Sequence, residues 1–301
     1  MALRSHNIPA LLTQVARDLA AERSVDESAA FVELVATETA WAEIFRHIDT
    51  ISDFAVRHKL RNLELDYTVA FVRNEMQQVL PRSGNDVWAL ERTSYLTGLF
   101  SDAFNLWDEY CAALDMLEVD LREELEASSL TPRRVKNRMH DIELVREILG
   151  AMNRVIFERT GLAGEEGAIN KVESHSAQLV LCERVPGIPL SLAVIYLITG
   201  SRLGFPLYGV NTPGRFLLKW QLGDLEIFVD VFDKGSLVTR QNLEMLLSAN
   251  LSGYSTRLLD PAPFEIITRR SLANLAALAI RGEDTDRARK LENLSRGLFG
   301  F

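Results

Sequence analysis

The chain contains the run Arg184-Val-Pro-Gly-Ile-Pro-Leu-Ser191, which leads into an apolar segment from Leu190 to Leu203. Pro186-Gly187-Ile-Pro189 is typical of a sharp turn that places Pro189 in the first turn of a helix, where its missing N–H is not needed. The helix is apolar on nearly all sides, and Gly204 follows its last residues. These features predict a buried central helix.

Three strand-like segments follow this helix: Pro206 to Asn211, Phe216 to Gln221 and Leu225 to Phe232. Leu222-Gly223-Asp224 has the composition of a hairpin turn between the last two. We therefore expect the helix to pack against a small antiparallel sheet.

Helical periodicity dominates the remainder of the chain. It runs from residue 8 to residue 80 and returns in a C-terminal pair of helices, roughly Pro263 to Ile280 and Asp284 to Arg296. The segment Pro81-Arg-Ser-Gly84 is the clearest interior break. We expect an α+β fold with a helical N-terminal domain at 1–84, a helix-and-sheet domain at 85–260, and a C-terminal helical hairpin at 261–301 packed on it.

Composition limits the classes of function. The chain has 301 residues, 47% of them hydrophobic, and a formal net charge of -9, so it can bury a core but offers nucleic acid and anionic membranes no general attraction. Its two cysteines, Cys111 and Cys182, lie far apart and are expected to be ordinary buried residues. No apolar run reaches the roughly 20 residues of a membrane span. We expect a cytoplasmic protein with no nucleic-acid or membrane partner.

Three polar residues near the central helix and sheet are candidates for chemistry. Ser191 lies at the start of the helix, where it either acts as a nucleophile or oxyanion-binding hydroxyl or simply caps the first turn. Arg215 begins the second strand, and its guanidinium stays protonated, so it is a cation and not a base. Asp230 lies among apolar neighbours, where an ionised carboxylate needs a partner. We expect an ion pair between Arg215 and Asp230.

Four further residues are candidate binding residues beside these positions: His175, Glu183, Arg184 and Asn211. His175 is the one histidine near the central helix in sequence, although a lone loop histidine is more often solvated than catalytic. The chain has no Cys/His cluster, phosphate-binding loop or dinucleotide motif. We expect no cofactor and no metal.

The ordered motifs resemble the soluble SirB-type proteins of the transglutaminase-like superfamily. The resemblance is carried by Glu183-Arg-Val-Pro-Gly-Ile-Pro-Leu-Ser191-Leu, Leu203-Gly-Phe-Pro206, Tyr208-Gly-Val-Asn-Thr-Pro-Gly-Arg215-Phe and Phe228-Val-Asp230-Val-Phe-Asp-Lys-Gly235. It covers roughly Trp88 to the C-terminus. It implies a papain-like core, in which a helix bearing a Cys nucleophile packs against a sheet that supplies His and then Asp.

The resemblance places the nucleophile at or within about two residues of Ser191, the His at Arg215 and the Asp at Asp230. Two of the three catalytic roles would then be vacant, since neither Cys nor His is present there. We therefore expect a non-catalytic protein that binds a peptide, a protein or a small anionic ligand in a vestigial active-site cleft.

Two alternatives stay open. One is a residual hydrolase or acyltransferase that uses Ser191 as nucleophile and His175 as base. The other is a helical protein-interaction scaffold that acts through residues 1–80.

Overall fold

A computed structural model describes residue 48 and residues 54–80, 86–103, 106–130, 138–250 and 255–300. The chain divides into two compact units, residues 1–71 with 102–104, and residues 72–101 with 105–301. Most of the predicted N-terminal helical domain, and with it most of the proposed interaction surface in residues 1–80, lies outside the described residues. The domain limits at 84 and 260 stay predictions.

The described part of the first unit is the beginning of one long helix, α4 (Phe54–Val79), whose residues from Val72 onward belong to the second unit. The second unit contains the remaining elements. Its longer helices are α5 (Val87–Gly98), α6 (Trp107–Ala127), α8 (Ile142–Asn153), α10 (Pro189–Arg202), α11 (Arg240–Asn250), α12 (Phe264–Arg281) and α13 (Thr285–Phe299). Its short ones are a π-helix, η4 (Arg154–Arg159), the 3₁₀ turns η5 (Glu166–Asn170), η6 (Glu173–His175) and η7 (Thr256–Leu259), and α9 (Ala177–Cys182).

The sheet has four strands in the order β1-β2-β3-β4, all antiparallel to their neighbours. Strands β1 (Leu207–Thr212), β2 (Arg215–Leu222) and β3 (Leu225–Asp230) correspond to the three that the sequence predicts. The fourth, β4 (Ser236–Val238), was not predicted. Three residues are too few to show the two-residue alternation that identifies a strand.

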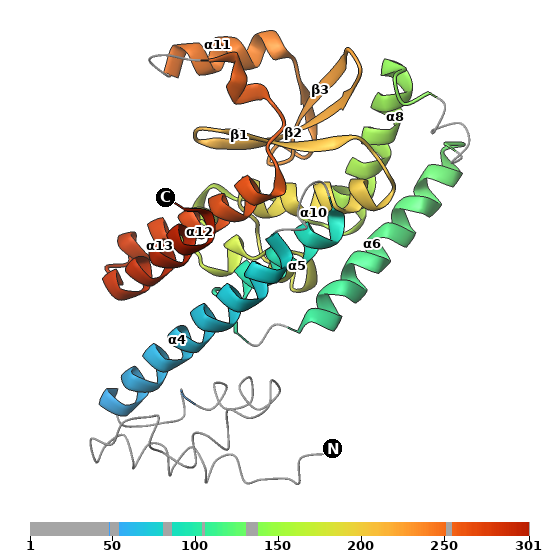
Figure 1. Cartoon of the computed structure of the whole chain (residues 1–301). Coiled ribbons are helices and arrows are strands. Elements are labelled where there is room, and N and C mark those ends of the chain that lie inside the picture. Colours follow the sequence, from blue (N-terminus) through green and yellow to red (C-terminus); the bar gives the residue numbers. More distant parts are fainter. Residues whose placement is uncertain are drawn as a thin grey trace. The chain divides into compact units, whose positions relative to one another are not determined.

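The two faces of the sheet are covered by different helices (Figure 1). On one face, Val210, Leu217 and Phe228 pack with Leu243 and Leu247 of α11. On the other face, α10 packs against β1 and β2. Side chains on a strand alternate between its faces, so neighbouring residues of β2 meet different helices.

The central helix α10 is buried as the sequence predicts. Every residue from Leu190 to Gly200 is buried. A Cβ on Gly200 would collide with Leu207 of β1, so the missing side chain lets helix and sheet approach closely. Together with the C-terminal hairpin of α12 and α13, this arrangement confirms the expected α+β fold.

A chain of hydrogen bonds joins α10 to the loop between β3 and β4. The Tyr196 hydroxyl donates to Asn153 Oδ1 at 3.0 Å, and Asn153 Nδ2 donates to the Gly235 carbonyl at 3.0 Å. Gly235 has a φ of +79°, and a Cβ there would overlap the Asn153 side chain. Asn153 thereby fixes the loop that follows Asp230.

The close contact between Gly235 and Asn153 leads to the first prediction. Gly235→Ala should lower the free energy of unfolding by about 2 kcal/mol more than Gly204→Ala, because it displaces Asn153 and its two hydrogen bonds in addition to straining the backbone. Gly204 is the matched control, since it has a φ of +75° and open space around it. Urea unfolding measures both variants. Equal losses would show that the contact with Asn153 is unimportant.

Candidate functional site

The expected ion pair between Arg215 and Asp230 is confirmed. Arg215 Nη1 lies 2.9 Å from Asp230 Oδ2, and the two side chains are 59% and 8% exposed. Both residues lie on the face of the sheet that α11 covers, because Arg215 alternates in phase with Leu217 and Asp230 with Phe228. The buried carboxylate is therefore paired with a cation that keeps most of its own surface in solvent.

The other carboxylate oxygen of Asp230 holds the turn after β3. Its Oδ1 accepts from the backbone N–H of Phe232 at 3.1 Å and of Asp233 at 3.4 Å. The Asp230 carbonyl accepts from the Gly235 N–H at 2.9 Å. Three donors thus stabilise the buried charge, and they draw the turn around Asp230.

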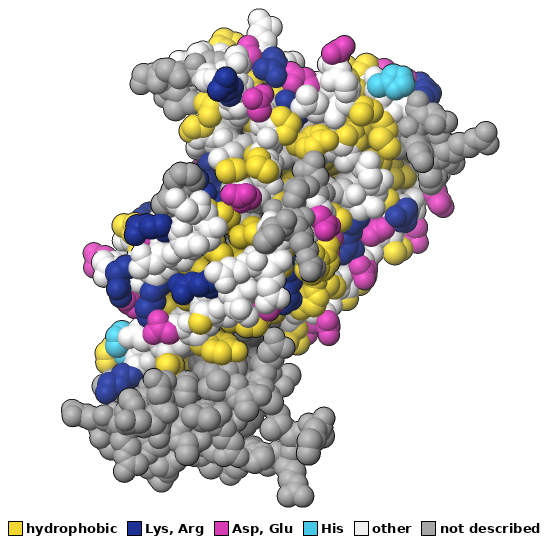
Figure 2. All heavy atoms as spheres, viewed as in Figure 1, with side chains coloured by type: hydrophobic (Ala, Val, Ile, Leu, Met, Phe, Trp, Pro, Cys, Tyr) yellow, Lys and Arg dark blue, Asp and Glu magenta, His cyan; other side chains and the backbone are white. Residues whose placement is uncertain are grey.

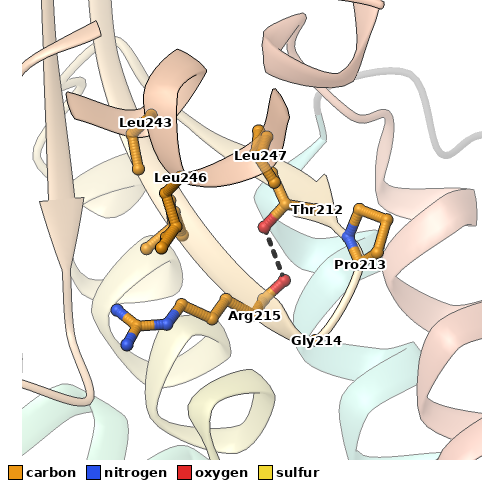
Figure 3. A pocket seen from close by; sticks show the side chains of 8 residues that line it. Thr212, Pro213, Gly214, Arg215, Leu243, Leu246 and Leu247 are labelled. Atoms are coloured by element: carbon orange, nitrogen blue, oxygen red, sulfur yellow. Dashed lines mark hydrogen bonds between the residues drawn. The ribbon is translucent and has the colours of Figure 1, made fainter. Parts of the chain in front are cut away.

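A pocket of about 300 Å³ lies beside Arg215 (Figure 3). It is lined by the hairpin turn 212–215, by Leu217, and by Leu243, Leu246 and Leu247 of α11. Thr212 Oγ1 donates to the Arg215 carbonyl at 2.9 Å, and Gly214 has a φ of +75°, so the turn is held tightly. Arg215 is the one charged residue in this lining, and the other side chains are mostly aliphatic.

Ser191 caps the start of α10. Its Oγ accepts from the Ile188 N–H at 3.0 Å and lies 2.8 Å from the Ser174 carbonyl and 3.1 Å from the Ile188 carbonyl, either of which can take its proton. The residue is 2% exposed. Both hydrogen-bonding functions of the hydroxyl are therefore engaged by backbone, as the capping interpretation expects.

This capping role leads to the second prediction. Ser191→Ala should lower the free energy of unfolding by about 1–2 kcal/mol, because it leaves buried backbone groups at Ile188 and Ser174 without their partner. Ser248→Ala is the control. Ser248 also bonds a backbone carbonyl, that of Met245, but it is exposed, so its loss should stay within about 0.5 kcal/mol. Equal unfolding midpoints for the two variants in urea would contradict the role given to Ser191.

His175 is buried and not solvated, which corrects the expectation for a loop histidine. It is 8% exposed in η6, and its Nε2 lies 3.1 Å from the Ile169 carbonyl, the position of a donated hydrogen bond. Burial lowers the pKa of the ring and so favours the neutral form. No hydrogen bond joins His175 to Ser191 among the interactions of the described residues.

The remaining candidate binding residues lie at separate places. Glu183 and Arg184 are exposed, Arg184 has a φ of +60°, and its guanidinium donates to the Leu181 carbonyl. Asn211 Oδ1 accepts from Arg270 Nη1 at 2.7 Å. The structure thus brings Arg215 and Asp230 together, and it records other partners for Arg184 and Asn211.

Sequence reasoning missed two parts of this site. Leu243, Leu246 and Leu247 of α11 line the pocket, and their i, i+3, i+4 spacing was a readable signal of an apolar helix face. The contact of Asn153 with Gly235 spans 82 positions and leaves no local signal. Cys182 was expected to be buried and is exposed, because it lies at the last turn of the short helix α9.

Comparison with known proteins identifies the family. The sequence matches the transglutaminase-like superfamily over residues 108–273, which include α10, the sheet and both members of the ion pair. The chain belongs to this superfamily.

Relatives of this transglutaminase-like chain come from bacteria and animals. A UPF0162 protein of Xylella fastidiosa is 30% identical over 174 residues, which cover 56% of this chain and 57% of the relative. F-box only protein 21 of Homo sapiens is 30% identical over 168 residues, which cover 53% of this chain and 26% of the relative. The chain therefore spans little more than half of the first relative and about a quarter of the second. No solved structure gives a significant match.

Two further observations bear on cofactors and membranes. Among the described residues, no group of three or more His, Cys, Asp or Glu side chains is placed to hold a metal ion. No helix in the described ranges is long and apolar enough to cross a membrane. On the face shown in Figure 2, basic and acidic side chains of the described residues are interspersed.

Proposed function

We propose that this chain is a SirB-type, non-catalytic member of the transglutaminase-like superfamily that binds a peptide, a protein or a small anionic ligand at Arg215 and the adjoining pocket. The observation that carries the proposal is the ion pair between Arg215 and Asp230. The resemblance assigns a catalytic His to the first of these positions and its orienting Asp to the second.

The chemistry of the residues supports a loss of catalysis. A guanidinium stays protonated at physiological pH, so Arg215 cannot take a proton from a nucleophile. The Ser191 hydroxyl is engaged with backbone at the start of α10. The His175 ring bonds the Ile169 carbonyl. Acyl transfer by a triad needs an activated nucleophile and a base, and these contacts supply neither.

The same residues favour binding. Asp230 uses one guanidinium nitrogen of Arg215, and that contact is the one recorded for this side chain. An arginine presents five N–H donors in a planar fork, so donors remain for an anionic group. The adjacent pocket offers apolar surface next to this cation.

A panel of acyl donors tests the proposal. The intact chain is incubated with a glutamine-containing peptide plus a primary amine, with a peptide anilide and with an activated ester. We expect wild type and Ser191→Ala to give the same rates as each other in every assay and no peptide or amine product above buffer, because the acceleration of a triad is absent. Circular dichroism confirms that both proteins are folded.

Turnover by the wild type that Ser191→Ala abolishes in the folded variant would contradict the proposal and support the Ser-dependent hydrolase or acyltransferase. Turnover that His175→Gln also abolishes would identify the base.

A further inference from the structure

We propose that the pocket beside Arg215 is a binding site for a small apolar monocarboxylate, with the hydrocarbon part among the leucines of α11 and the carboxylate on the Arg215 guanidinium. This inference rests on the proposed binding function and names the class of ligand. It follows from the size of the pocket, its lining and the state of Arg215.

The pocket suits a small hydrocarbon group. Its volume of about 300 Å³ stands at the lower end of the range for small-molecule sites. Leu217 contributes from the sheet, and Leu243, Leu246 and Leu247 contribute from three positions on one side of α11. Such a lining gives an alkyl or small branched group apolar contacts and offers a polar body little compensation for its lost water.

Arg215 determines the charge of the ligand. Its side chain extends beneath the α11 leucines at the edge of the pocket (Figure 3). No carboxylate lines the pocket, and the nearby Asp230 carboxylate already accepts from Arg215 and from two backbone N–H groups. The remaining guanidinium donors match the planar geometry of a second carboxylate.

One negative charge fits this site better than two. Asp230 lies 2.9 Å from Arg215 Nη1 and cancels part of the positive potential that a ligand meets. Arg215 is also the one cation in the lining of the pocket. A carboxylate requires a single cationic partner, whereas a phosphate dianion would carry an unmatched charge beside Asp230.

A second arginine at the same turn provides a matched control. Arg270 of α12 donates to Asn211 Oδ1 at 2.7 Å and to the Thr212 carbonyl at 3.3 Å. Asn211 alternates in phase with Gly209, whose Cα faces Ile267 of α12, so Arg270 lies on the opposite face of the sheet from the pocket. Arg270→Gln therefore removes a similar charge from the same turn without touching the pocket.

Four probes separate the features of the ligand: octanoate has both, acetate has the carboxylate alone, 1-octanol has the tail alone, and octylammonium carries the opposite charge. Isothermal titration calorimetry on the full chain measures affinity, and the amide chemical shift of Gly214 reports binding in the pocket. We expect octanoate to bind at least about tenfold more tightly than each of the other three.

Variants then locate the site. Arg215→Gln should weaken octanoate about tenfold and leave 1-octanol unchanged, and Arg270→Gln should leave octanoate within twofold of wild type. If Arg215→Gln does not fold, Leu246→Asp replaces it, since Leu246 lines the pocket and is 43% exposed. Met245→Asp is its control, because Met245 is 63% exposed on α11 and is not part of the lining.

Several outcomes would overturn the assignment. Equal affinity for octanoate and 1-octanol would remove the role of Arg215, and equal loss in Arg215→Gln and Arg270→Gln would indicate general electrostatics. A peptide that ends in a free leucine and binds where octanoate does not would assign the pocket to a peptide C-terminus. Each of these results leaves the absence of turnover untouched, so the inference can fail while the proposed non-catalytic function stands.

Discussion

The buried carboxylate of Asp230 is the constraint on which the site depends. A negative charge in a side chain only 8% exposed must be compensated, and here Arg215 and the N–H groups of Phe232 and Asp233 do so. These contacts connect the start of β2, the end of β3 and the loop that leads to β4. The hydrogen bonds from Tyr196 through Asn153 to Gly235 connect the same loop to the central helix. The helix, the sheet and the charged pair are therefore held as one arrangement.

This arrangement explains how a framework can outlast its chemistry. Asp230 caps a turn whatever residue lies opposite it, and Ser191 caps a helix without being a nucleophile. An arginine at position 215 satisfies the carboxylate at least as well as an imidazole, because it is charged at every physiological pH. The exchange preserves the fold while it removes the base, and it leaves a cation with spare donors beside an apolar pocket.

Sequence reasoning reached the parts of the molecule that are encoded locally. The apolar run after Pro189, the glycine at 223 and the alternation in β2 and β3 were enough for the helix and three strands, and the isolated charge of Asp230 among Phe and Val was enough for its partner. The contact of Asn153 with Gly235 and the burial of His175 depend on segments that are distant in sequence. No periodicity carries such information, so they could not be read from the residues alone.

A double-mutant cycle between Arg215 and Asp230 tests the central claim most directly. Urea unfolding is measured for wild type, Arg215→Gln, Asp230→Asn and the double variant. The account predicts that Asp230→Asn costs more than Arg215→Gln, because Asp230 also holds the turn, and that the double variant costs about 0.5–1 kcal/mol less than the sum of the two. Costs that add within about 0.3 kcal/mol would show that the two side chains do not stabilise each other, and the account would be wrong.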